Sequence, residues 1–60
     1  MTEQEARKIA EKELKRTIGK LELENNDVFR FELEVYKNNE VYMTFVDVFI
    51  EEKFVIVLPA

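Results

Sequence analysis

The sequence contains no cysteine and no histidine, and only one glycine and one proline among its 60 residues. The absence of cysteine excludes disulfides, and the absence of both residue types excludes the thiolate and imidazole sites that soft metals prefer. One Gly and one Pro leave little room for long loops. A chain of this length buries only roughly 60% of its unfolded surface, so its stability has to come from oligomerisation or from consistent local structure.

The sequence also lacks a long apolar run and a surplus of basic residues. Its longest unbroken apolar run, residues 54–58, is too short to cross a bilayer, and the first 20 residues hold no apolar signal-peptide core. As written, the chain is therefore expected to be cytoplasmic, or else to be a mature fragment of a longer protein. Nine basic and 13 acidic residues give a net charge of −4, which disfavours binding to nucleic acid or to an anionic membrane. We expect one domain, residues 1–60.

Residues 3–17 are predicted to form a helix. Thr2 is followed three residues later by Glu5, which is the pattern of a capping box. An apolar stripe at helical spacing comprises Ala6, Ile9, Ala10, Leu14 and Ile18. Gly19 is predicted to end the helix as its C′ residue. Because the stripe is narrow, we expect the helix to pack on a sheet.

Four strands are predicted, over residues 20–24, 28–36, 41–50 and 54–58. The first two alternate apolar and polar residues cleanly. A three-residue loop, 25–27, sets Leu23 opposite Phe29 and Glu22 opposite Arg30, which is a favourable charge pair. The predicted fold is therefore α+β, with the N-terminal helix packed on a four-stranded antiparallel meander in the order α-β-β-β-β.

The hairpin between the second and third strands allows two registers. A three-residue loop, 37–39, places Val41, Met43 and Phe45 on the core face. A two-residue Asn38-Asn39 type I′ turn instead places inside Tyr42, Thr44, Val46, Val48 and Ile50. The first register pairs better near the turn, the second keeps Asp47 out of the core, and a bulge in the third strand would reconcile them. We expect the first register as far as Phe45.

The predicted helix can cover only one face of this sheet, because about 15 residues span roughly 22 Å. The other face is expected to be acidic on the first two strands and apolar on the last two. The candidate interaction face comprises Glu32, Glu34, Tyr42, Val46, Val55 and Val57. An exposed apolar patch beside charge is typical of a binding surface. The alternative is that the sheet curls around the helix and buries residues 54–58.

Pairs of carboxylates are the only candidate catalytic groups in the sequence. Glu22, Glu24, Glu32 and Glu34 are expected near one another, but acid–base catalysis needs a pocket that separates two pKa values, and an open sheet face supplies none. Residues 25–27 lack the spacing of a calcium loop. We therefore expect no catalytic residue, no metal and no cofactor, and a protein that is not an enzyme.

The order of these segments resembles the PepSY-type domains. Residues 2–10, Thr-Glu-Gln-Glu-Ala-Arg-Lys-Ile-Ala, look like the opening helix of that family. Residues 19–24, a turn, an alternating strand and the segment 41–46 followed by Asp47 are also similar. The family has a Gly-containing turn after this Asp, whereas residues 47–53 contain no Gly. The resemblance implies a non-catalytic domain associated with the regulation of peptidases, with no active-site residues.

These observations predict a small non-catalytic module for protein interaction or regulation. Its partner is expected to be another protein or a second copy of the chain, bound through the open sheet face or an edge strand. Two alternatives stay open: a designed or idealised scaffold without natural activity, and a small phage or viral protein that blocks a host protein.

Overall fold

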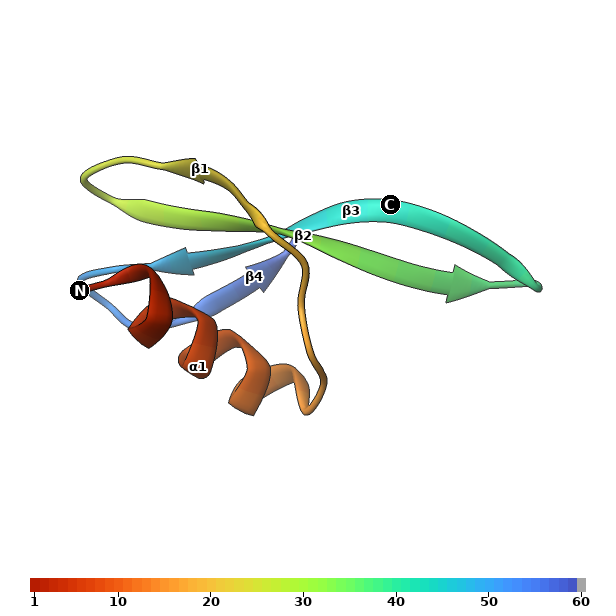
Figure 1. Ribbon diagram of the computed structural model, residues 1–60, viewed down its shortest axis with the longest axis horizontal. Coiled ribbons are helices and arrows are strands. Elements are labelled where there is room, and N and C mark those ends of the chain that lie inside the picture. The colour runs from red at the N-terminus through yellow and green to blue at the C-terminus, as the bar shows by residue number, and fades with distance from the viewer. Residues whose placement is uncertain (60) are drawn as a thin grey trace.

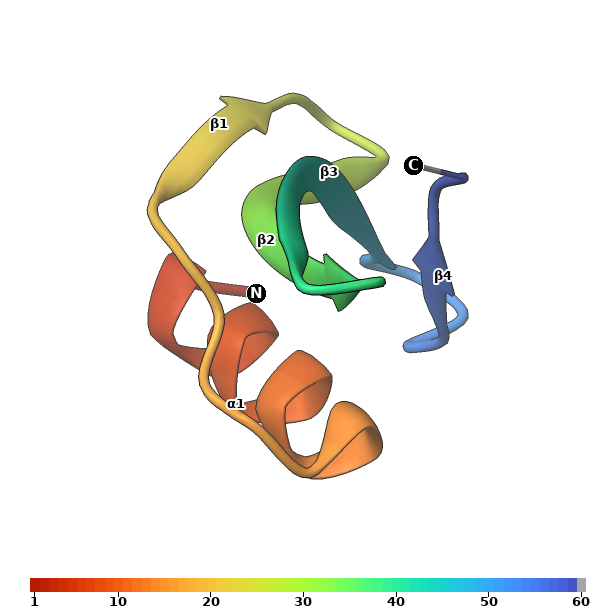
Figure 2. The ribbon, with the colours of Figure 1, turned by 90° about the vertical axis from the view of Figure 1, so that its right-hand side faces the viewer.

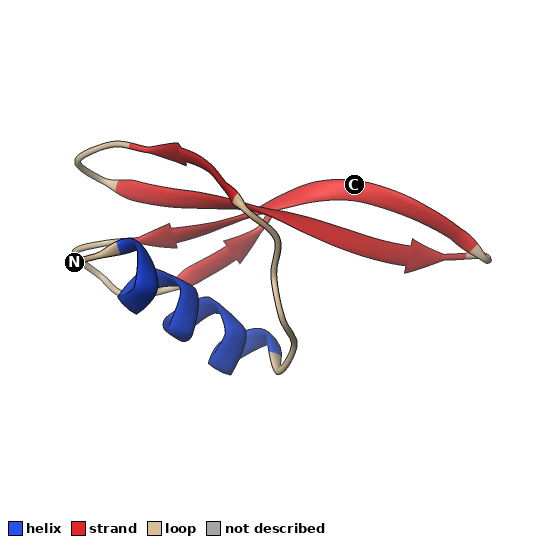
Figure 3. Ribbon diagram, in the orientation of Figure 1, coloured by secondary structure: helices blue, strands red, loops and turns tan. Residues whose placement is uncertain are grey.

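The computed structural model describes residues 1–59 and contains one helix and one sheet (Figures 1 and 3). The elements are α1 (Glu3–Leu14), β1 (Leu21–Glu24), β2 (Val28–Lys37), β3 (Glu40–Phe49) and β4 (Val55–Val57). The strands are antiparallel and lie side by side in the order of the sequence, β1-β2-β3-β4. The predicted α+β meander is confirmed.

Helix α1 begins as predicted and ends three residues earlier than predicted. The Thr2 hydroxyl accepts the Glu5 N–H at 3.2 Å, and the Glu5 carboxylate accepts the Thr2 N–H at 3.1 Å, so the capping box is complete. The helix stops at Leu14 because Lys15 takes the left-handed conformation, with φ of 59°. The Glu11 carboxylate then accepts the N–H of Ile18 at 3.1 Å, which turns the chain towards the sheet. The prediction that Gly19 ends the helix is wrong.

Gly19 instead allows a close approach between two backbone segments. Its N–H donates to the carbonyl oxygen of Glu32 at 2.7 Å, beside β2. A Cβ atom at this position would lie 2.9 Å from the same oxygen, which is closer than real Cβ contacts. Any side chain at residue 19 would therefore push the chain away from β2.

The register of β1 on β2 agrees with the prediction at only one end. Leu21 lies opposite Phe31 as expected, but a bulge after Leu21 places Leu23 opposite Arg30 instead of Phe29. The strands leave residues 25–27 between them, as predicted. The pairing differs because the Asn25 N–H donates to the carbonyl of Val28 and the Asn25 side chain accepts two backbone N–H groups, so that Glu24 lies opposite Phe29. The bulge directs Leu23 away from the helix.

The β2–β3 hairpin has the two-residue turn, so the register that we expected is wrong. Lys37 pairs with Glu40, and Asn38 and Asn39 have φ of 52° and 65°, both positive as a type I′ turn requires. The pairing then continues without a shift to Val28 opposite Phe49, so β3 contains no bulge in its pairing with β2.

The core lies between α1 and one face of the sheet (Figure 2). It contains buried side chains of α1, β2 and β3: Ala6, Ala10, Phe29, Phe31, Leu33, Val46 and Val48. The molecule is elongated, at 36 × 20 × 17 Å, and the β2–β3 hairpin extends beyond the helix (Figure 1). The hairpin arm, which we define as residues 34–43, therefore lacks the support that the rest of the sheet receives.

Candidate functional site: the open face of the sheet

The side of the sheet opposite α1 carries no second layer (Figure 2), and we call it the open face. Side chains of directly paired residues lie on the same side of a sheet, so the register assigns its members. They are Leu23, Val28, Arg30, Glu32, Glu34, Tyr36, Val41, Met43, Phe45, Asp47, Phe49 and Ile56. Among them, Leu23 is 44% exposed, Met43 53% and Ile56 41%. Eight of the twelve members of this face are apolar, and several of these side chains are exposed to water.

The six residues of the predicted interaction face do not share one side of the sheet. Glu32 and Glu34 lie on the open face, opposite Phe45 and Met43. The other four lie on the helix side, because their partners belong to the helix side: Tyr42, Val46, Val55 and Val57. Val46 is fully buried in the core and Val55 packs against it. The predicted grouping fails because it relied on the three-residue hairpin loop.

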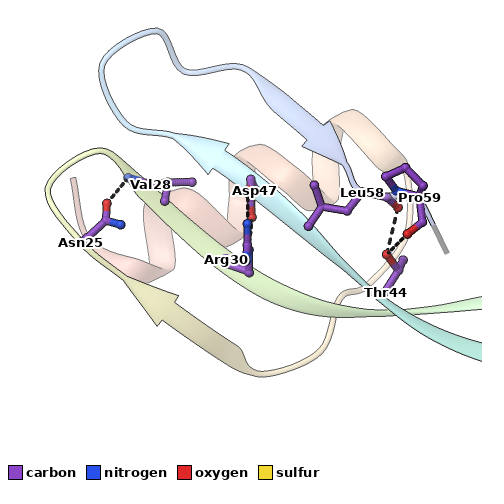
Figure 4. A network of polar contacts seen from close by, with 7 residues as sticks. All are labelled: Asn25, Val28, Arg30, Thr44, Asp47, Leu58 and Pro59. Atoms are coloured by element: carbon purple, nitrogen blue, oxygen red, sulfur yellow. Dashed lines mark hydrogen bonds and ion pairs between the residues drawn. The ribbon is translucent and has the colours of Figure 1, made fainter.

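An ion pair occupies the centre of the open face (Figure 4). Arg30 Nε lies 2.7 Å from Asp47 Oδ1, and Arg30 Nη2 lies 2.9 Å from Oδ2, so the contact is bidentate. The guanidinium also lies over the ring of Phe45, 5.7 Å from its centroid. Hydrogen bonding to Asp47 raises the pKa of Arg30. Asp47 is almost fully buried, and its charge is balanced where it lies.

The remaining charges of the open face lie towards β1 and β2. Lys20 Nζ is 3.9 Å from a carboxylate oxygen of Glu32, a contact of little energetic weight because Lys20 is exposed. The Tyr36 hydroxyl donates to Glu34 at 3.0 Å, which raises the pKa of Tyr36. The predicted cluster of four glutamates does not form: Glu22 lies at the bulge, and Glu24 pairs with Phe29 of the helix side.

The hairpin arm extends the open face beyond the body of the protein. Its side chains Tyr36 and Val41 pair with each other and are among the most exposed apolar groups of residues 1–59. On the β4 side, the last contacts before the arm come from Thr44, whose hydroxyl donates to the carbonyls of Leu58 at 2.9 Å and Pro59 at 3.3 Å (Figure 4). These bonds explain how a hydroxyl is tolerated at a buried position.

The structure offers little to a small ligand or a metal. A shallow hollow of about 210 Å³ is lined by Arg16, Thr17, Ile18, Gly19, Glu32, Glu34 and Met43. Pockets for small molecules commonly measure about 300–1,000 Å³. A second hollow, of about 470 Å³, reaches this size, but only Val35, Lys37, Asn38 and Tyr42 line it, at the exposed end of the hairpin. Within residues 1–59, no three acidic side chains gather as metal ligands would, and α1 is neither long nor apolar enough to span a membrane.

Comparison of the chain with family profiles, with curated proteins and with solved structures found no match. The site therefore rests on its own geometry. The predicted interaction face contained none of the eight apolar members of the open face, which are Leu23, Val28, Tyr36, Val41, Met43, Phe45, Phe49 and Ile56. One signal pointed to Met43 and Phe45: an Asn-Asn pair tolerates positive φ at both turn positions, which favours the two-residue hairpin.

Proposed function

We propose that this chain is a small non-catalytic protein-interaction module that binds its partner through the open face. The observation that carries the proposal is the set of exposed apolar side chains on the side without a helix: Tyr36, Val41 and Met43 on the arm, and Leu23 and Ile56 on either side of the Arg30–Asp47 pair. Contiguous exposed apolar surface on a soluble domain is typical of a binding site.

The charges of this face support the same proposal. Covering apolar surface is favourable by about 25 cal/mol per Å², whereas burying an unbalanced charge is costly. Arg30 and Asp47, at the centre, already neutralise each other through two hydrogen bonds. A partner can therefore cover the middle of the face without leaving a lone charge beneath it.

A protein suits this surface better than a small molecule, because the face is broad and the hollow near Gly19 is small and open. A role in regulating peptidases would follow from the PepSY resemblance alone, and no feature of the open face specifies it. The designed-scaffold alternative differs in what it predicts, which is the absence of any partner for this face.

Site-specific photocrosslinking in living cells tests the proposal. A photoreactive amino acid is placed at Met43 or at Ile56, both on the open face. Tyr42 and Val57 are matched controls, because each adjoins a test position on the same strand, has a similar exposure of 40% or 43%, and lies on the helix side. We expect a crosslinked product of one defined mass from both test positions and little from the controls.

Equal yields from the two sides of the sheet, or no product from Met43 and Ile56, would contradict the proposal. The mass of the product also identifies the kind of partner. Twice the mass of the chain indicates a second copy, and any other mass indicates a different protein.

A further inference from the structure

We propose that the partner of the open face is a second copy of this chain, packed face to face so that two sheets form the centre of an α/β/β/α sandwich. This inference rests on the proposed function and names its partner. Sheets that pack in this way lie about 10 Å apart, with their strands within about 30° of one another.

The first argument is the thinness of the core in one copy. Only eight hydrophobic residues are buried, although 47% of the chain is hydrophobic. The chain has no cysteine to form a disulfide, and neither cysteine nor histidine to bind a structural metal. A domain of this size gains most from a second layer, and a second copy supplies that layer without any further component.

The second argument is the area available. Four strands at a spacing of about 4.8 Å give a face roughly 19 Å wide. The longest dimension of the molecule, 36 Å, is set by the β2–β3 hairpin, and the arm is two strands wide. The projected face is thus on the order of 500 Å². Its accessible part lies mainly on the arm and at Leu23 and Ile56, because Val28 and Asp47 are already buried. Stable complexes bury about 800 Å² of accessible surface per partner, so the area of this face supports a dimer of modest affinity.

The third argument is that the face does not repel itself. A two-fold axis parallel to the strands, between β2 and β3, lays β2 of each copy over β3 of the other. Arg30 then faces Asp47 of the second copy, so that the four charges of the two ion pairs alternate in sign across the interface. Glu32 and Glu34 face Phe45 and Met43 of the second copy, not their own equivalents.

The position of Glu34 lets its charge escape burial in this arrangement. Glu34 lies on the part of β2 that β1 does not cover, since β1 pairs with β2 only from Phe29 to Phe31, and the segment before it bonds to Glu32. Its carboxylate can therefore reach water at the rim while its methylene groups cover apolar surface.

Light scattering from low micromolar to millimolar concentration tests the proposal on the full chain. We expect a dimer for the natural sequence. Ile56→Glu and Met43→Glu place a carboxylate in the interface and are expected to weaken dimerisation by roughly a hundredfold or more. Val57→Glu and Tyr42→Glu, on the helix side of the same strands, are expected to leave the dimer intact. Circular dichroism establishes that each variant is folded.

Three results would overturn the dimer: a monomeric natural sequence at every concentration, a dimer that survives both Ile56→Glu and Met43→Glu, or equal dissociation by the helix-side controls. The Met43 change lies in the arm, outside the core, so unfolding at Ile56 alone leaves the test decisive. A monomer whose open face crosslinks to a different protein would overturn the dimer and keep the proposed function. A monomer without such crosslinks would overturn both.

Discussion

At the scale of single residues, Arg7 joins the helix to the start of the sheet. Its guanidinium donates to the carbonyls of Ile18 at 3.2 Å and Gly19 at 2.8 Å, and it lies 4.8 Å from the ring centroid of Phe31. Glu3 lies 3.6 Å away, one helical turn earlier. The positions of the helix and of the close Gly19 contact thus depend on a side chain that a hydropathy pattern treats as solvent-exposed.

Glu5 should give the helix a pH dependence of its own. Its hydrogen bonds with Thr2 lower the pKa of Glu5 below the ordinary value of 4.5. A carboxyl whose pKa is lower in the folded state stabilises that state above the unfolded pKa, and this contribution disappears as pH falls through the folded pKa. We expect the natural sequence to lose helix stability between about pH 5 and the lowered pKa, in proportion to protonation of Glu5.

The comparison variant is Glu5→Gln, which retains the hydrogen-bonding pattern of a capping box but does not titrate. Because the other acidic residues are shared, the difference between the two unfolding free energies, measured in urea as a function of pH, isolates Glu5. If the two curves stay parallel from pH 6 to pH 3, the Thr2–Glu5 contact has no electrostatic component.

At the scale of elements, hydrophobic periodicity locates the helix and all four strands, because each element must present one apolar face to the shared core. Ends and registers depend on contacts from elsewhere in the chain. The Ile18 N–H donates to the Glu11 carboxylate just after the early end of helix α1. The pairing of β1 with β2 is displaced by one residue because the Asn25 N–H donates to the carbonyl of Val28. Neither contact has a signature in local periodicity.

The sequence leaves the register of β3 ambiguous for a physical reason. Apolar residues occupy both alternations of this strand: Val46 and Val48 inside, Met43 and Phe45 outside. A strand that is apolar on both sides carries no information about which side is the core. Asp47 favoured the register that the structure has, because that register keeps its carboxylate out of the core, beside Arg30 on the neighbouring strand. The predicted interaction face was wrong for this reason. Apolar residues on both sides of β3 make the open face apolar, and they also hide which side of the strand is open.

The hairpin turn provides a test of this register. Asn39 has φ of 65°, where glycine is free of the steric penalty that a Cβ atom carries. We expect Asn39→Gly to raise the free energy of unfolding by a few tenths to about 1 kcal/mol, and Asn39→Val to lower it by about 1–2 kcal/mol. Urea denaturation measures both. A neutral Asn39→Val variant would show that residue 39 does not need a positive φ.

At the scale of the whole molecule, the apolar surface is distributed unevenly. One helix covers one side of the sheet, and the arm carries Val41 and Met43 into solvent on the other side. An isolated two-stranded hairpin is marginally stable in water. In the proposed dimer the two arms lie against each other at the same end of the sandwich, because the two-fold axis runs parallel to the strands. Dimerisation would thereby supply the arm with the packing that α1 does not provide.

Folding and association should therefore be linked, and the melting temperature should depend on protein concentration. Mass action stabilises a folded dimer as concentration rises, whereas the melting temperature of a folded monomer is independent of concentration. We expect the melting temperature of the natural sequence to rise across the concentration range used for light scattering. Ile56→Glu should melt at a lower temperature that does not change with concentration, and Val57→Glu should retain the dependence.

The melting temperature of the dimer should also depend on salt concentration. Each copy carries a net charge of −4, so two copies repel at long range, and salt screens that repulsion. The central Arg30–Asp47 pairs are short-range and partly buried, and salt screens them less. Added salt should therefore raise the melting temperature of the natural sequence by more than that of Ile56→Glu. An equal shift in both would place the repulsion within one chain, and a flat concentration dependence of the natural sequence would mean that the arm is stable without a partner.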